Sequence, residues 1–143
     1  MNRTGQPENN ELVIAAELKN LPLVLDFIEG HLEGTSISIK QKMQILVAVE
    51  EIFVNIASYA YAPDQGNAIV RIDFSDEPVE VTITFMDNGI PFDPLQRRDP
   101  DVTLSAEERR IGGLGIFMTK KTMDSVDYEY KNGQNILRLK KSI

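Results

Sequence analysis

Three clusters of residues in this chain have types and spacing that could do chemistry, and the first is the pair Glu51 and Asn55. Both lie in a segment with helical periodicity, so side chains four positions apart project from one face about one turn apart, while Glu50 points roughly 100° away. A carboxylate can accept a proton or orient a water, and an amide oxygen is a good ligand for Mg²⁺. The same pair is also consistent with the polar stripe of an amphipathic helix.

The second cluster is Asp87-Asn88-Gly89, directly after a predicted strand. A carboxylate at a strand end can accept a hydrogen bond from the exocyclic amine of a purine. The missing side chain of Gly89 would let a ring approach the backbone. The alternative is a simple β-turn, for which Asp-Asn-Gly is a favoured sequence.

The third cluster is the glycine-rich run 112–115, directly before a predicted helix. A helix N-terminus preceded by glycines offers unpaired N–H groups and a favourable dipole to a phosphate. A hinge at the end of a long loop explains the run equally well. The chain contains no Walker A pattern, no G-x-G-x-x-G after a strand and no G-x-S-x-G elbow, which excludes the common P-loop, Rossmann and α/β-hydrolase sites.

Composition narrows the class of protein further. The 143 residues favour one domain, which we place at residues 11–143 after a flexible polar leader, 1–10. The chain has no cysteine and a single histidine, so a thiolate or histidine-rich metal site is excluded. The net charge of -7 argues against binding to nucleic acid or an anionic membrane, and we expect a cytoplasmic protein. Basic residues concentrate in residues 97–143, where they could face a nucleotide triphosphate or simply be solvated.

The elements that must position these clusters follow from hydrophobic periodicity and turn signals. The pattern predicts a strand at 11–18, a helix capped by Asn20 and stopped by Gly34, a long helix at 38–60, strands at 68–74 and 79–86, a loop at 88–112, a helix at 114–123, and a hairpin of strands 125–130 and 136–139. This order predicts an α+β two-layer sandwich with helices on one face of a mixed, mostly antiparallel sheet.

Taken together, the three clusters resemble the N, G1 and G2 boxes of the GHKL ATP-binding superfamily, which includes sensor histidine kinases, DNA gyrase and mismatch-repair ATPases. The fold of that superfamily, the Bergerat fold, is the sandwich predicted above. Within it the chain looks most like the small bacterial anti-sigma-factor serine kinases. The likeness includes the Tyr-Ala-Tyr ending at 59–61, Pro91-Phe92-Asp93-Pro94, and the run from Gly113 into 123–128. Tyr59 stands where many relatives have histidine.

The resemblance implies a role for each matched residue of the first two boxes. Asn55 would be the Mg²⁺ ligand, and Glu51 would be the base that activates the acceptor hydroxyl. Asp87 would accept the amino group of adenine, and Gly89 would let the ring lie close. ATP or ADP with Mg²⁺ is therefore the expected cofactor.

The third box would hold the phosphates. The resemblance places Gly113, Gly115 and the N–H groups around Leu114 against them, under a lid at about 94–112. Charge and position alone suggest Arg110, or its neighbour Arg109, as a further phosphate contact.

The function implied is that of a protein serine kinase that phosphorylates a small STAS-type anti-sigma-factor antagonist. Its output would be a sigma factor or another regulator, released or bound by partner switching, and a homodimer is expected. The alternative is a nucleotide-gated module that binds a partner without significant phosphotransfer. A third reading is an unrelated α+β interaction domain, which predicts no nucleotide binding at all.

Overall fold

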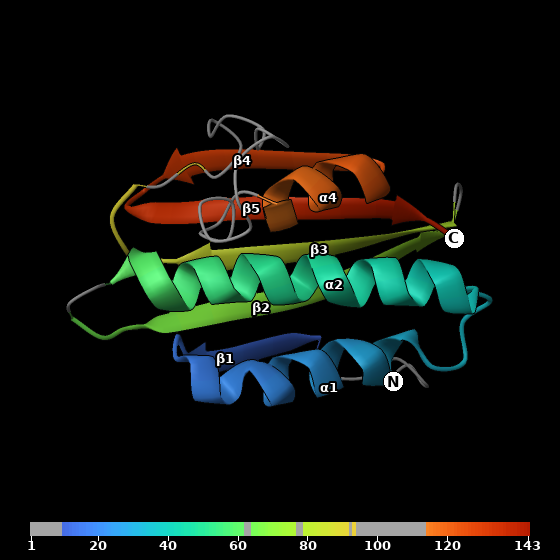
Figure 1. Cartoon of the computed structure of the whole chain (residues 1–143), viewed down its shortest axis with the longest axis horizontal. Coiled ribbons are helices and arrows are strands. Elements are labelled where there is room, and N and C mark those ends of the chain that lie inside the picture. The colour runs from blue at the N-terminus through green and yellow to red at the C-terminus, as the bar shows by residue number, and fades with distance from the viewer. Residues whose placement is uncertain (1–9, 62–63, 77–78, 92, 94–113) are drawn as a thin grey trace.

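The computed structural model describes residues 10–61, 64–76, 79–91, 93 and 114–143. Five strands form one sheet, and the helices α1, α2 and α4 form a single layer over it (Figure 1). The strands are β1 (Glu11–Ala15), β2 (Asn67–Asp76), β3 (Val79–Asp87), β4 (Ser125–Lys131) and β5 (Gln134–Ser142); the helices are α1 (Leu21–Leu32), α2 (Ile39–Asn55) and α4 (Leu114–Thr122), with short turns at Leu18–Asn20 and Ile56–Ala60. The predicted α+β two-layer sandwich is confirmed.

The sheet has the strand order β1-β2-β3-β5-β4, and each of its pairings is antiparallel. The prediction of a mixed sheet is therefore wrong for the described strands. β4 runs in the same direction as β3, because both pair antiparallel with β5. Since β5 inserts between them, β3 and β4 never become parallel neighbours.

Helix α2 is the central element of the helical layer. It begins at a capping box, in which the Gln41 N–H donates to Ser38 Oγ at 3.0 Å and the Ser38 N–H donates to Gln41 Oε1 at 3.1 Å. Its inner face is buried against the sheet through Ile45, Val49 and Phe53. Because burial of large apolar side chains is favourable, these contacts hold the helix against the sheet.

The C-terminal end of α2 departs from the predicted uninterrupted helix. The α-helix ends at Asn55 and continues as one π-helical turn, Ile56–Ala60. π-Helical turns are rare in proteins, and many of those that occur lie at functional sites. The π turn changes the direction of the side chains that follow Asn55.

Other boundaries follow turn chemistry. Asn20 occupies the N-cap position of α1, but its amide donates to the Ala15 carbonyl at 2.9 Å and makes no capping bond. The β4–β5 hairpin turns at Asn132 and Gly133, whose φ values of 54° and 78° are those of a tight I′-type turn.

Among the described residues, one helical segment, Ile39–Ala60, is long and apolar enough to cross a membrane by length and composition. In the fold it packs between α1 and α4 and covers the sheet (Figure 1), which is the placement of a core helix. The outer face of its first half nevertheless exposes the apolar side chains of Ile39, Met43 and Val47.

Candidate functional site

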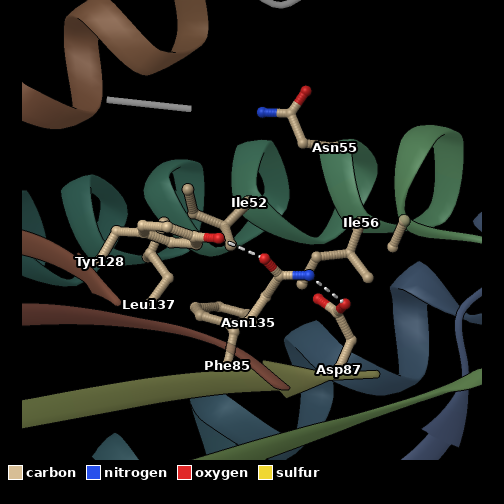
Figure 2. A pocket seen from close by; sticks show the side chains of 9 residues that line it. Ile52, Asn55, Ile56, Phe85, Asp87, Tyr128, Asn135 and Leu137 are labelled. Atoms are coloured by element: carbon tan, nitrogen blue, oxygen red, sulfur yellow. Dashed lines mark hydrogen bonds between the residues drawn. The ribbon is translucent and has the colours of Figure 1, made fainter. Parts of the chain in front are cut away.

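A small pocket lies where the C-terminal end of α2 meets the ends of the central strands (Figure 2). Its apolar wall is formed by Ile52, Ile56, Ala60, Phe85 and Leu137, and its polar groups come from Asn55, Asp87, Tyr128 and Asn135. The volume is about 30 Å³, which is room for a water or two. An apolar pocket with a few convergent polar groups is typical of a small-molecule site.

Asp87 is the charged group of this pocket, and only 5% of its surface is exposed. One carboxylate oxygen, Oδ1, accepts hydrogen bonds from the Gly89 N–H and from Asn135 Nδ2, both at 2.9 Å. Burial raises the pKa of Asp87, while these two hydrogen bonds act in the opposite direction. Within the described part of the chain, Oδ2 has no hydrogen-bond partner. This buried oxygen is an unused acceptor at the edge of the pocket.

A relay of side chains from the C-terminal hairpin fixes the Asp87 carboxylate. Asn135 lies directly opposite Asp87 in the β3–β5 register. Its amide donates to Asp87 and to the Ile90 carbonyl at 2.8 Å, and the Tyr128 hydroxyl donates to its Oδ1 (Figure 2). Sequence reasoning gave neither Asn135 nor Tyr128 a role. No local sequence pattern could have found Asn135, because its contact with Asp87 depends on β5 lying beside β3.

Gly89 has a reason of its own within the fold. A Cβ at this position would lie 2.2 Å from the carbonyl oxygen of Ala60, and the next residue, Ile90, donates its N–H to that same oxygen at 2.9 Å. Only glycine permits this approach. The segment after β3 is therefore fastened directly to the π turn that follows Asn55.

Tyr61 completes this attachment. Its hydroxyl accepts the Asn88 N–H at 2.7 Å and donates to the Asn67 carbonyl at 2.7 Å. Burial is the largest cause of the raised pKa of Tyr61, so the hydroxyl stays protonated and remains a donor. Asn88, Gly89 and Ile90, the three residues after β3, are thus held against Ala60 and Tyr61 at the end of the helical layer.

Glu51 and Asn55 do project from α2 together, as their spacing predicts. Asn55 Nδ2 donates to Glu51 Oε2 at 3.2 Å. Because the carboxylate can only accept, this contact assigns the nitrogen of the amide and leaves the Asn55 oxygen directed elsewhere. Asn55 is 4% exposed, and within the described residues its Oδ1 has no partner. An orphaned buried amide oxygen suits Mg²⁺, which needs few protein ligands when substrate phosphates supply the others.

The predicted residues are not all gathered at one point. Figure 2 shows the Asn55 amide and the Asp87 carboxylate on opposite sides of the pocket, with Ile56 between them. Leu114 and Gly115 are the first two residues of α4, so their backbone N–H groups belong to a helix N-terminus as predicted. Gly113, Arg109, Arg110, the predicted lid at 94–112 and residues 1–9 of the predicted leader lie outside the described residues.

Comparison with known proteins shows the family of this chain. The chain belongs to the histidine kinase-like ATPase domain family, which it matches over residues 14–141. It is 28% identical over 102 residues to the serine/threonine-protein kinase BtrW of Bordetella bronchiseptica, and this match covers 71% of each chain. The predicted GHKL membership is confirmed, and the relative carries the name of the expected class of kinase.

Two solved structures have a similar fold at 14% sequence identity. One contains the RsbU and RsbW domains of a Mycobacterium tuberculosis protein, with a TM-score of 0.65 over 94% of this chain and 32% of that chain. The other is the SiaB–SiaC complex of Pseudomonas aeruginosa, with a TM-score of 0.58 over 93% of this chain and 89% of that chain. At this identity they show a shared fold.

Proposed function

We propose that this chain binds ATP with Mg²⁺ and transfers the γ-phosphoryl group to a serine or threonine of a partner protein. The observation that carries the proposal is the Asp87 carboxylate, which is buried at an apolar pocket: one oxygen is held by two donors, and the other has no hydrogen-bond partner among the residues that the structure describes. Such an oxygen is suited to accept a hydrogen bond from the exocyclic amine of adenine. The family match and the kinase relative support the same reading.

Each residue then has one task. Asp87 selects the adenine amine, held in place by Asn135. Asn55 Oδ1 would hold Mg²⁺, which would neutralise phosphate charge during transfer. Glu51 would accept the proton of the incoming hydroxyl. The N–H groups of Leu114 and Gly115 at the start of α4, together with that of Gly113, which precedes them in the sequence, would bind phosphate oxygens.

The pocket must widen to admit a purine, since its volume is about 30 Å³. Phosphoryl transfer asks a protein chiefly for positioning and charge neutralisation, and one carboxylate, one amide and a helix N-terminus supply both. From its charge and its position in the sequence, we propose Arg110 as an additional phosphate contact. From the length of the chain, we propose that residues 11–143 form a single kinase domain.

The partner is proposed by class. We propose that the partner is a small STAS-type anti-sigma-factor antagonist and that the output of the switch is a sigma factor or another regulator. We propose that this chain itself acts as a homodimer in the cytoplasm. The similarity to kinases and to a chain solved in a two-protein complex supports a protein partner. The net charge of -7 favours a protein over nucleic acid or an anionic membrane.

A Glu51→Ala variant tests the transfer step. We expect ATP binding to persist and labelling of the partner from radioactive ATP to fall by about a hundredfold or more, in line with loss of a general base. Glu50→Ala is the matched control, because Glu50 is exposed on the same helix and points away. Labelling that survives Glu51→Ala would remove the general base from the proposal.

A second candidate function rests on the hydrogen bond between Asn55 and Glu51. The Asn55 amide occupies one oxygen of the Glu51 carboxylate, so that oxygen is not available to a substrate hydroxyl, which favours a nucleotide-gated binding module without significant phosphotransfer. In that case ATP would change the affinity for the partner, and neither the wild type nor the Glu50→Ala variant would label the partner.

A further inference from the structure

An apolar groove that the nucleotide chemistry does not use lies between the first half of α2 and helix α4. It is lined by Lys40, Met43, Gln44, Val47, Met118 and Thr122, and its volume is about 350 Å³. Met43, Val47 and Met118 are 53%, 52% and 44% exposed, and Ile39 extends the stripe at 82%. Large side chains exposed side by side mark an interaction surface more often than a solvated face.

The parts of the two helices that form this groove, the first half of α2 and the whole of α4, are basic. The segment Ile39–Val47 and helix α4 together contain Lys40, Lys42, Lys120 and Lys121 and no acidic residue, in a chain whose net charge is -7. Lys42 is turned towards α1, where it pairs with Glu29 at 2.9 Å. Lys40 lines the groove itself, and the other two lysines lie in the last turn of α4.

The groove also continues towards the catalytic end of α2. Met43, Val47, Glu51 and Asn55 follow one another at intervals of four residues, so they occupy neighbouring positions along one side of the helix. Val47 and Glu51 are about 6 Å apart along the helix axis. A segment bound in the groove would thus bring an adjoining hydroxyl within about one helical turn of Glu51.

We propose that this groove docks an acidic amphipathic helix of the protein that receives the phosphoryl group, an inference that rests on the proposed function. Its apolar side chains enter between Met43, Val47 and Met118, and its carboxylates face Lys40, the lysine that lines the groove. A concave groove between two helices fits a helix in this way. An anionic membrane is disfavoured because the whole chain carries net negative charge.

The first test uses a probe of defined chemistry and needs neither ATP nor transfer. A 16-residue helical peptide with leucines at helical spacing and glutamates on its flanks is titrated into protein labelled with ¹³C-methyl methionine. We expect the Met43 and Met118 signals to shift, with Met123, which is buried, unchanged. The same peptide with lysine in place of glutamate should bind at least tenfold more weakly. No shift at Met43 and Met118, or equal binding of both peptides, would overturn the proposal.

Matched variants separate the groove from general stickiness. Met43→Ser should weaken the glutamate peptide at least fivefold, whereas Leu23→Ser should not, because Leu23 is similarly exposed at 56% but lies on α1. Equal effects of the two variants would overturn the proposal. Equal shifts with vesicles of anionic lipid, or concentration-dependent shifts without peptide, would instead assign the groove to a membrane or to a second copy.

The outcome is independent of the nucleotide site. ATP titration of the Met43→Ser variant should match the wild type. Peptide binding without ATP binding would support a docking groove but refute the proposed kinase, and with it the phosphoryl acceptor as the docked protein. ATP binding without peptide binding would overturn the docking proposal and leave the proposed kinase intact.

Discussion

Replacing Asp87 by asparagine tests the chemistry of the pocket with almost no change of shape. The new amide oxygen can still accept from the Gly89 N–H and from Asn135, the two donors that hold Oδ1 at 2.9 Å. The second oxygen, however, becomes an NH₂ group that faces the pocket. An amine of adenine would then meet a donor where the wild type offers an acceptor.

The expected loss follows from that exchange. A hydrogen bond to a charged group contributes about 1.5–3 kcal/mol, and leaving the new side-chain NH₂ group and the adenine amine without acceptors adds about 1 kcal/mol or more. We therefore expect ATP affinity to fall by about 3 kcal/mol or more, which is at least about a hundredfold. Inosine triphosphate, whose base presents an oxygen in place of the amine, should gain affinity for Asp87→Asn relative to ATP.

The assay is calorimetric titration of ATP and inosine triphosphate into the wild type, Asp87→Asn and Asp76→Asn. Asp76 is exposed at the far end of β2, so its variant controls for the loss of one negative charge. Unchanged ATP affinity in Asp87→Asn, or an equal loss in the control, would refute the assignment of the purine-binding group.

The same variant has a stability signature whose sign follows from the raised pKa of Asp87. A raised pKa means that the folded protein keeps this proton to higher pH than the unfolded chain does. The contribution of Asp87 to stability is therefore greatest at low pH and is lost as pH rises through the window between the two pKa values. Asp87→Asn lacks this loss, so its free energy of unfolding in urea should improve relative to the wild type as pH rises from about 4 to 7. A constant difference across that range would contradict the burial argument.

Three further changes probe the groups around Asp87. Gly89→Ala should destabilise the protein by about 1–3 kcal/mol in urea unfolding, because its Cβ would lie 2.2 Å from the Ala60 oxygen, whereas Gly30→Ala, which meets nothing within 4 Å in α1, should be neutral or slightly stabilising. Asn135→Ala removes a hydrogen bond that lowers the pKa of Asp87, so that pKa, followed by NMR of the carboxyl carbon, should rise and ATP affinity should fall about tenfold; an unchanged pKa would contradict the relay. Tyr61→Phe should cost about 1 kcal/mol of unfolding free energy through the two hydrogen bonds of its hydroxyl, and an unchanged denaturation midpoint would contradict their importance.

The sequence was sufficient where local patterns decide structure. Helix α2 could be predicted because its apolar residues recur at helical spacing, and the β4–β5 hairpin because Asn132-Gly133 favours the tight turn that is observed. The neighbouring projection of Glu51 and Asn55 follows from the same periodicity. The family resemblance was carried by the three short motifs around Glu51, Asp87 and Gly113, and not by overall composition.

The sequence was insufficient where contacts join distant segments. The hydrogen bond between Asn135 and Asp87 spans 48 residues and depends on β5 lying beside β3, which no local pattern specifies. The mixed sheet was predicted wrongly for the same reason, since the position of β5 decides which strands are neighbours. The π turn at Ile56–Ala60 continues the helical spacing of α2, so periodicity cannot distinguish it from an α-helix.

The central claim is that Asp87 and Asn55 form a nucleotide site that uses Mg²⁺. The most direct measurement is calorimetric titration of ATP, with and without Mg²⁺, into the wild type and Asn55→Ala. We predict that Mg²⁺ strengthens ATP binding to the wild type and that Asn55→Ala removes most of this gain, while circular dichroism shows an intact fold. Absence of ATP binding by a folded wild type, or an equal Mg²⁺ effect in both proteins, would contradict the account.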